Sequence, residues 1–379
     1  MIKVAICQPL VPAYRIPVFE DIAKTDDIEL VLYAGQGNGS LRAINQGQNF
    51  RVKQANVREI GMLGRVVKLQ WGQIAAVRSG RHDVVVFPWD IGYFTLMPAL
   101  ILARRRGIYT ILWGHGYSKR SSRFLDIIRS MIGKRADAVL LYSKKMANRQ
   151  ITDFGFSKDR VYVAPNTLDN QPIQKAIQYW KSRADRLDEF RRSHSIDVSK
   201  TVVFVSRLEP ENRTDMLLHA LHISLNKIPG IKLIVIGDGS DRTRLKNLTE
   251  ELGLSQHVIF AGAIYDERVI APWMLSATFF CYPINIGLSL LHAYNYSLPV
   301  VTSDAIMQHG PEIEAFQDKT NGLFYRHGCI EDMANKWLCI FQNPSLRQSL
   351  SVGARQTANQ YTINSMVSGF LCAVRSVVT

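Results

Sequence analysis

The sequence is poor in cysteine. It has five cysteines, an odd number that cannot all pair within the chain, and no two of them form a CxxC motif. This usage argues against a disulfide scaffold or a zinc site and is typical of reduced thiols in the cytosol. The first residues contain no basic stretch ahead of an apolar run, so no secretory signal peptide is predicted. Internal repeats are also missing. We therefore expect a cytoplasmic, globular protein, and its 379 residues favour two domains.

Several functional signatures are absent as well. No GxGxxG follows the first apolar segment, which disfavours a dehydrogenase. Paired carboxylates of the glycosidase type are not evident, which disfavours a hydrolase. The formal net charge is +14, but neither zinc-finger spacing nor an aromatic RNA-binding signature accompanies it. The charge thus favours phosphorylated ligands or an acidic lipid surface, and no nucleic-acid partner is expected.

Short, β-branched apolar segments alternate with helical segments along the whole chain. This alternation predicts an α/β fold with parallel sheets buried on both faces. Strands are expected at 3–7, 30–33, 83–87, 109–113, 138–142, 161–164, 201–205, 232–237, 258–261, 277–281 and 299–302. We expect two Rossmann-like domains, residues 1–166 and 167–355, and a C-terminal helix within 356–379 that packs on the first domain. Ligands of such sheets bind beyond the carboxyl ends of the strands, so a cleft between the domains is the expected site.

One apolar run, residues 84–103, has about the length of a membrane span. It is interrupted by Pro88, Asp90, Gly92 and Pro98. We interpret it as a buried strand, a loop and a helix.

The most informative segment runs from Pro283 to Asp304. A strand ends at Pro283, and a loop containing Gly287 opens a helix. The first N–H groups of such a helix are unpaired and favour an anion such as a diphosphate. Taken alone, this pattern also fits an ordinary strand, turn and helix in which His292 is a core or surface residue.

This segment resembles the donor site of the family 4 (group 1) retaining glycosyltransferases, which have the GT-B fold of two Rossmann-like domains facing a central cleft. The family pattern is Glu-x-Phe-Gly-Leu-x-x-x-Glu-Ala, followed by Gly-x-Pro-Val-Val, a small residue and Asp. The matching positions are Gly287, Leu288, Ala293, Pro299, Val300, Val301 and Asp304. Ile284 and His292 stand where the family has its two glutamates.

The resemblance implies which residues bind the donor. In the family the second glutamate binds the ribose, and a histidine can also form such a hydrogen bond, so His292 is predicted to do so. Isoleucine cannot bond a sugar, and Ile284 leaves the donor sugar unassigned. The donor-binding residues implied in this segment are Asn285, Gly287, Leu288, Ser289 and His292.

The segment Val205–Asp215 resembles the family's Gly-Arg-Leu-x-x-x-Lys-Gly-x-Asp, in which Arg and Lys grip the diphosphate. Arg207 matches, whereas Asn212 replaces the lysine and Arg213 the glycine. Our hypothesis is that Arg213 supplies the second positive charge, since a guanidinium can clamp phosphate. The alternative is a solvated loop residue.

Two glycines, Gly237 and Gly239, follow a strand in a Gly-x-Gly turn that is also similar to the family. They either let the backbone approach the base or ribose of the donor, or make only a tight turn. Glu312 lies in a family-like Pro-Glu-Ile, and we expect it to bond backbone N–H groups near the donor loop.

In the first domain, His115 lies between two glycines after a strand, as a His-Gly does in many family members. It is predicted to bond a sugar hydroxyl or to steady the oxocarbenium charge; otherwise it stabilises the turn. Arg15 is a candidate for phosphate or acceptor binding. Asp90 either binds the acceptor or caps the following helix.

Basic and apolar residues share the segment 119–135. The basic residues are Lys119, Arg120, Arg123, Arg129, Lys134 and Arg135, and the apolar residues are Phe124, Ile127, Ile128, Met131 and Ile132. Such a helix either docks on an anionic bilayer that contains a lipid-linked acceptor, or packs its apolar stripe on the core and exposes its basic face to solvent.

Together these resemblances imply a retaining glycosyltransferase of cell-envelope polysaccharide synthesis. It would move a sugar from a nucleotide diphosphate sugar to a hydroxyl of a glycan or lipid-linked acceptor, without a metal or other cofactor. Arg207 and the helix start near Gly287 would stabilise the leaving diphosphate. The loss of both glutamates suggests an alternative, a non-catalytic nucleotide-sugar-binding relative that acts as a partner subunit. A sugar epimerase of the same fold would form product from the donor alone.

Overall fold

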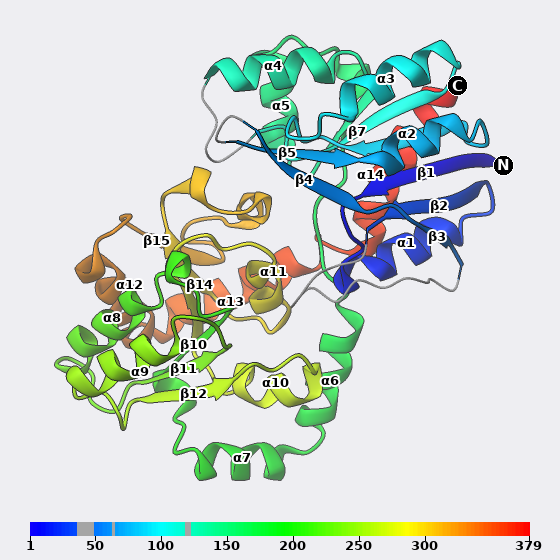
Figure 1. Ribbon diagram of the computed structural model, residues 1–379. Coiled ribbons are helices and arrows are strands. Elements are labelled where there is room, and N and C mark those ends of the chain that lie inside the picture. The colour runs from blue at the N-terminus through cyan, green and yellow to red at the C-terminus, as the bar shows by residue number, and fades with distance from the viewer. Residues whose placement is uncertain (36–48, 63–64, 118–122) are drawn as a thin grey trace. The chain divides into compact units, whose positions relative to one another are not determined.

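The computed structural model describes residues 1–35, 49–62, 65–117 and 123–379 and divides into two units (Figure 1). Unit 1 comprises Met1–Thr167 and Ile363–Thr379, and unit 2 comprises Leu168–Thr362. Each unit is described by itself.

Unit 1 contains a seven-stranded parallel sheet of order β3-β2-β1-β6-β7-β8-β9. The strands are β1 (Ile2–Gln8), β2 (Ile28–Ala34), β3 (Arg51–Gln54), β6 (Val84–Pro88), β7 (Tyr109–Gly114), β8 (Ala138–Leu141) and β9 (Val161–Val163). A separate antiparallel hairpin joins β4 (Val57–Met62) to β5 (Arg65–Gln70). The central strands are buried on both faces, as their uninterrupted apolar sequences predict.

Helices cover both faces of this sheet. α1 (Ile16–Ala23) and α14 (Ile363–Val378) share one apolar core with the sheet, and α2 (Trp71–Arg78), α3 (Leu96–Arg105) and α5 (Lys144–Thr152) share the other. The apolar run 84–103 forms β6, a turn and most of α3, so its interpretation as a strand, a loop and a helix is confirmed. In the described part of the chain, no helix is long and apolar enough to cross a membrane.

The remaining helix of unit 1, α4 (Arg123–Gly133), exposes part of its apolar stripe, although Ile132 packs against the core. Phe124, Ile127 and Met131 are 68%, 46% and 60% exposed, whereas Asp126 and Arg129 are buried and form an ion pair with each other. The expectation that the apolar stripe packs on the core is therefore wrong for these three residues, because the ion pair occupies the buried face. Of the predicted basic residues, Lys119, Arg120 and the side chain of Arg123 lie outside the described residues.

Unit 2 contains a six-stranded parallel sheet of order β12-β11-β10-β13-β14-β15. Its strands are β10 (Thr201–Val205), β11 (Lys232–Ile236), β12 (Val258–Gly262), β13 (Phe279–Tyr282), β14 (Val300–Ser303) and β15 (Gly322–Tyr325). Its helices are α6 (Gln171–Lys181), α7 (Ala184–Ser193), α8 (Asp215–Leu225), α9 (Arg242–Glu251), α10 (Glu267–Met274), α11 (Leu288–Asn295), α12 (Ile330–Gln342) and α13 (Pro344–Ala358). The strand order reverses between β10 and β13, which makes the loops after these two strands the topological switch point, the usual ligand site of such sheets.

Candidate functional site

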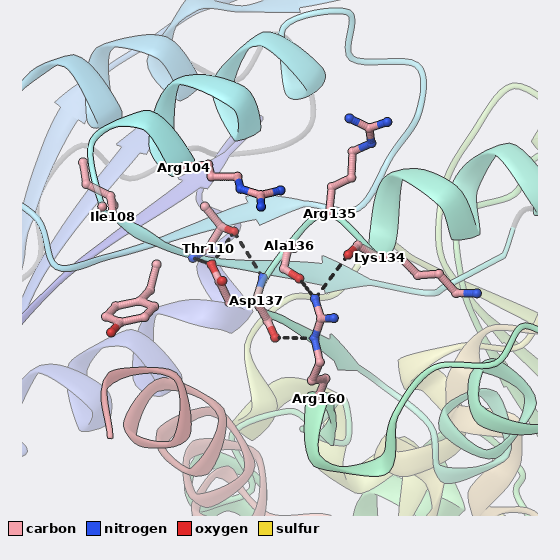
Figure 2. A pocket seen from close by; sticks show the side chains of 10 residues that line it. Arg104, Ile108, Thr110, Lys134, Arg135, Ala136, Asp137 and Arg160 are labelled. Carbon is pink, nitrogen blue, oxygen red and sulfur yellow. Dashed lines mark hydrogen bonds between the residues drawn. The ribbon is translucent and has the colours of Figure 1, made fainter.

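A basic cavity lies at the amino edge of the unit 1 sheet, away from the predicted site residues (Figure 2). It has a volume of about 720 Å³ and is lined by Arg104, Lys134, Arg135, Asp137 and Arg160, among others. The guanidinium of Arg160 is engaged, because it donates hydrogen bonds to the carbonyl oxygens of Lys134, Ala136 and Asp137. The cavity adjoins the starts of β7 and β8, whereas His115 and Asp90 follow the carboxyl ends of β7 and β6.

At the carboxyl edge of the unit 1 sheet, Arg15 and His115 both contact Tyr142. Arg15 is only 6% exposed, and its Nη2 donates to the Tyr142 hydroxyl oxygen at 2.8 Å. The guanidinium also lies over the ring of Trp113, with its carbon 4.9 Å from the ring centroid. The His115 ring centroid is 5.0 Å from that of Tyr142, and His115 is exposed. The structure thus brings together two residues that the sequence assigned to the acceptor and to catalysis.

No acid among the described residues balances the charge of Arg15. Among the described residues it forms no ion pair, and its Nη1 is buried without a hydrogen-bond partner. A buried charge of this kind is costly unless a further group compensates it. Cation–π contacts with the rings of Trp113 and Tyr142 supply part of that compensation. Arg15 is therefore suited to an anionic group of a ligand.

Asp90 is exposed at the end of β6, and its Oδ1 accepts a hydrogen bond from the Gly92 backbone N–H at 2.9 Å. α3 begins six residues after Asp90, and its N-cap residue is Thr95. The alternative that Asp90 caps this helix is therefore wrong. Its carboxylate remains accessible, and acceptor binding stays a prediction.

In unit 2, Arg207 follows the end of β10 at the switch point. It is exposed, and it forms no ion pair within the described part of the chain. Its carbonyl oxygen accepts a hydrogen bond from the side-chain amide of Asn212, which is 7% exposed and also bonds Ser206. Where the family has a lysine, this chain thus has a buried amide that holds the Arg207 loop.

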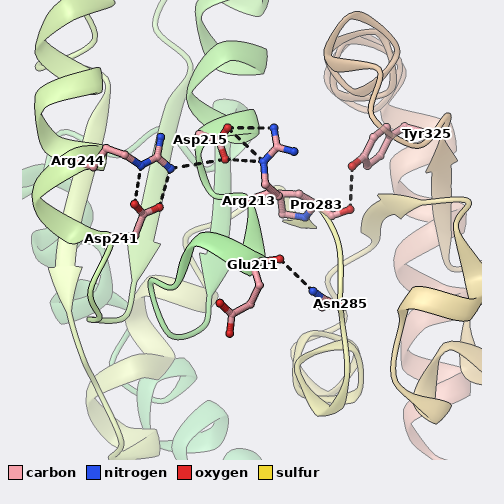
Figure 3. Close-up of polar contacts among 8 residues, drawn as sticks. All are labelled: Glu211, Arg213, Asp215, Asp241, Arg244, Pro283, Asn285 and Tyr325. Atoms are coloured by element: carbon pink, nitrogen blue, oxygen red, sulfur yellow. Dashed lines mark hydrogen bonds and ion pairs between the residues drawn. The ribbon is translucent and has the colours of Figure 1, made fainter. Parts of the chain in front are cut away.

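Arg213 is paired within its own unit (Figure 3). Its guanidinium forms a fork with Asp215, with Nε–Oδ1 and Nη2–Oδ2 distances of 3.1 Å. Hydrogen bonding to Asp215 raises the pKa of Arg213 above its usual value. The Asp215 carboxylate reduces the net positive charge at this position. Arg213 is therefore a weaker candidate than Arg207 for binding a diphosphate.

The glycines of the Gly-x-Gly turn face another loop of the same unit. A Cβ on Gly237 would lie 1.8 Å from the carbonyl oxygen of Ser206, and one on Gly239 would lie 2.3 Å from that of Leu208. The need for glycine is therefore explained by the close approach of this turn to the Arg207 loop. Their contact with a nucleotide stays a prediction.

Hydrogen bonds from several elements hold the loop between β13 and α11, among them one from the Tyr325 hydroxyl to the Pro283 carbonyl oxygen at 2.8 Å. The Asn285 side-chain amide donates to the carbonyl oxygen of Glu211 at 3.0 Å (Figure 3). The Ile286 N–H donates to Nδ1 of His309 at 3.2 Å, and the Gly310 N–H donates to the Ile286 carbonyl at 2.7 Å. Since Nδ1 of His309 accepts, the ring proton resides on Nε2, which lies 2.9 Å from the carbonyl oxygen of Ser303. This fully buried histidine orients the loop that opens α11.

The first turn of α11 faces the switch point. Gly287 is its N-cap residue, and the helix starts at Leu288. The hydroxyl of Ser289 donates to the carbonyl oxygen of Val205 at the end of β10, at 3.3 Å. This bond holds the start of α11, whose first N–H groups have no partner within the helix, beside the loop of Arg207. Joint binding of one anion by the two stays a prediction. Glu312 is buried, and its Oε2 lies 3.5 Å from the position that a Cβ on Gly287 would take, so it is near the donor loop. Its bonding to backbone N–H groups stays a prediction.

His292, one turn deeper in α11, contacts a carboxylate. Its Nε2 lies 3.1 Å from Oε1 of Glu267, the first residue of α10, and the Tyr296 hydroxyl donates to the other oxygen at 2.9 Å. Burial, and then the neighbouring Glu267, raise the pKa of Tyr296, so its hydroxyl keeps its proton. Nδ1 of His292 has no hydrogen-bond partner among the described residues, and ribose binding by His292 stays a prediction.

The sequence did not single out Glu267, His309 or Tyr265. Glu267 and His309 act through contacts with α11 and its loop, and residues 25 and 23 positions away in sequence give no local signal. Tyr265 is 92% exposed just after β12, and its position after an expected strand could have indicated a ligand contact. Among the residues that the structure describes, no three His, Cys, Asp or Glu side chains are grouped to hold a metal ion.

Comparison with known proteins agrees with the resemblance. Residues 185–357 match the family described as glycosyl transferases group 1. Over 174 residues the chain is 26% identical to a poly(ribitol-phosphate) alpha-N-acetylglucosaminyltransferase of Staphylococcus aureus, covering 45% of this chain and 34% of that protein. Over 236 residues it is 27% identical to a GDP-mannose-dependent alpha-(1-6)-phosphatidylinositol monomannoside mannosyltransferase of Mycolicibacterium smegmatis, covering 59% of each. The matches thus span about a third to three fifths of these relatives.

Solved structures resemble the whole chain. Anabaena Alr3699/HepE in complex with UDP has a TM-score of 0.74 at 17% identity, over 99% of this chain and all of that one. A glycosyltransferase from Rickettsia africae has a TM-score of 0.73 at 13% identity, over 100% and 99% of the two chains. The expected GT-B fold class is confirmed by these similarities and by the two parallel sheets.

Proposed function

We propose, from the match of residues 185–357 to the group 1 glycosyltransferases, that this protein is a retaining glycosyltransferase. Its donor is a nucleotide diphosphate sugar, and its acceptor is a hydroxyl of a glycan or lipid-linked saccharide in cell-envelope polysaccharide synthesis. The observation that carries the proposal is the position of Arg207. It is an exposed cation without an ion pair in the described chain, beside the N-terminus of α11 at the switch point.

The proposed reaction transfers one glycosyl group. The bond between the anomeric carbon and the diphosphate oxygen breaks, and the acceptor oxygen bonds the anomeric carbon on the same face. The acceptor proton passes to the leaving phosphate. Arg207 and the first N–H groups of α11 stabilise the negative charge on that phosphate. In line with the family resemblance, we propose that no metal ion takes part.

Unit 1 supplies the acceptor side of the proposal. His115 bonds a hydroxyl of the transferred sugar or steadies the oxocarbenium charge. Buried Arg15, whose charge no acid balances among the described residues, binds an anionic group of the acceptor. Asp90 accepts a hydrogen bond from an acceptor hydroxyl.

The second candidate is a non-catalytic nucleotide-sugar-binding relative. Ile284 and His292 motivate it, because the glutamates of the family are missing at both positions. The same Arg207 would then hold a nucleotide sugar without transfer.

One experiment separates these candidates. Purified protein is first screened by thermal shift against UDP- and GDP-sugars; a ligand at a hundred times its Kd should stabilise by about 2.7 kcal/mol. Any stabilising donor is then incubated with and without cell-envelope glycan or lipid-linked saccharide acceptors. Product that requires an acceptor and keeps the anomeric configuration by NMR supports the proposal. Binding without product supports the non-catalytic candidate, and product from donor alone indicates an epimerase.

A further expected result concerns His292. If His292 bonds the ribose, His292→Ala should weaken nucleotide binding roughly threefold to tenfold, the usual value of one hydrogen bond. Glu267→Gln should have a smaller effect, since Glu267 acts on the ribose only through His292. Calorimetric titration with the stabilising nucleotide measures both.

The matched control is His222→Ala, because His222 is an exposed histidine on α8 whose ring bonds the Leu252 carbonyl. It should leave the Kd unchanged. A His292→Ala protein with wild-type affinity would show that His292 only ties α11 to α10.

A further inference from the structure

The exposed apolar face of α4 is formed by Phe124, Ile127 and Met131. These residues are spaced by three and four positions, so they lie on one side of the helix. All three are large and about half exposed or more. The opposite side carries Asp126 and Arg129, which are 9% and 5% exposed.

The buried side of α4 is firmly held. Asp126 forms ion pairs with Arg129 and with Arg149 of α5, and the Trp89 indole N–H donates to the Arg129 carbonyl oxygen at 3.3 Å. These bonds fix the rotation of the helix, so the three apolar side chains cannot turn inward without breaking a buried ion pair. Breaking such a pair is strongly destabilising. The outward face is therefore a stable feature of the fold.

Cations lie next to the C-terminal end of α4. Lys134 and Arg135 follow directly on the last turn of α4, and with Arg104 from the end of α3 they line the basic cavity (Figure 2). All three are exposed and form no ion pair among the described residues. The acid lining the cavity, Asp137, already accepts hydrogen bonds from the N–H and hydroxyl of Thr110. Lys134 also lies over the ring of Phe156, with its Nζ 5.7 Å from the ring centroid. The exposed cations of the cavity thus lie next to the C-terminal end of α4.

We propose that this surface, Phe124, Ile127 and Met131 together with Arg104, Lys134 and Arg135, docks the protein on an anionic lipid bilayer. The apolar residues enter the boundary between headgroups and acyl chains, and the three cations bind lipid phosphates. The cavity of about 720 Å³ has room for a phosphate headgroup.

The small area of the exposed α4 face favours a lipid bilayer over another protein as its binding partner. A standard protein interface buries about 800 Å² on each partner. Three side chains on one helix offer only a fraction of that area, and flanking unpaired cations would repel a second copy of the same face. A bilayer needs no shape complementarity, and its negative surface matches the cations.

Vesicle flotation with the full chain tests the proposal without any substrate, so its outcome is independent of the transfer activity. Vesicles contain either phosphatidylcholine alone or phosphatidylcholine with about a third phosphatidylglycerol. The protein should float with the anionic vesicles, and high salt should release it, because charge interactions are screened. Neutralising Arg104, Lys134 and Arg135 to Gln should weaken binding roughly fivefold per cation.

The triple variant F124S/I127S/M131S should lose at least tenfold in partitioning. Its control is I60S/V198S/V352S, which removes three exposed apolar residues elsewhere and should bind like the wild type. Circular dichroism confirms that both variants fold. The proposal is overturned if the wild type does not float, if it floats equally with neutral vesicles, or if the α4 variant binds normally. It is also overturned if sedimentation shows that the α4 variant only converts a dimer to a monomer.

Discussion

Replacing Arg207 with alanine should lower kcat/KM for sugar transfer by roughly 10²–10³, the usual effect of removing one preorganised group from a developing negative charge. Arg207 is the exposed cation that follows β10, and no carboxylate among the described residues pairs with it. Its full charge is therefore available to the leaving diphosphate. Arg207→Lys keeps the charge but loses the fork geometry, so we expect it to retain intermediate activity.

Arg213→Ala is the informative comparison. Arg213 already bonds Asp215, which offsets its charge, so its loss should cost less than about tenfold. Arg183→Ala, a surface cation stacked on Tyr179, serves as the neutral control and should leave kcat/KM unchanged. Steady-state kinetics with the identified donor and acceptor measures all four variants. An Arg207→Ala enzyme within threefold of the wild type would remove Arg207 from the mechanism.

The strands could be predicted where burial on both faces leaves a continuous apolar run. Thr201–Val205 and Val84–Phe87 are such runs, and each forms a central strand. The hairpin of β4 and β5 has no such run, because charged residues such as Arg58, Glu59 and Lys68 interrupt its apolar ones. β3 is also exposed and charged. Edge and hairpin strands carry a weaker pattern, because one face meets water.

Candidate site residues could be predicted from the sequence where they follow the end of a strand. Arg207 and Gly287 follow strand ends, and parallel topology brings strand ends together. Residues whose role depends on a distant partner were not predictable in this way. Glu267 contacts His292, 25 positions away, only because the tertiary fold places it there. Asp215, by contrast, pairs with Arg213 only two positions away in the sequence.

The helix α4 shows the limit of periodicity most clearly. Its spacing of apolar residues predicts an amphipathic helix, and the helix is present. Which side of the helix faces the core depends on the side chains that the neighbouring elements present to it. Here Arg149 and the Trp89 indole contact the polar side of the helix, and Phe124, Ile127 and Met131 are left exposed.

Gly237→Ala should lower the free energy of unfolding of unit 2 by about 3 kcal/mol. Gly237 has a φ of 152°, a region that side chains rarely adopt, and its Cβ would lie 1.8 Å from the Ser206 carbonyl oxygen. The Gly237 N–H donates to the Gly262 carbonyl, and the Ser206 N–H donates to the Ile236 carbonyl. These bonds prevent the two loops from separating freely, so the methyl group must displace the turn that carries Arg207.

The expected loss of stability combines backbone strain with the steric clash of the added Cβ, and a second glycine separates these two contributions. Gly253 also has a positive φ, 69°, but nothing lies within 4 Å of its Cβ position. Gly253→Ala therefore reports backbone strain alone and should cost about 1 kcal/mol. Amide hydrogen exchange of β10 and β11 measures the local opening free energy directly, which suits a chain of two units. If Gly237→Ala costs no more than Gly253→Ala, the turn yields easily. The close approach of the two loops would then not be what requires glycine at this position.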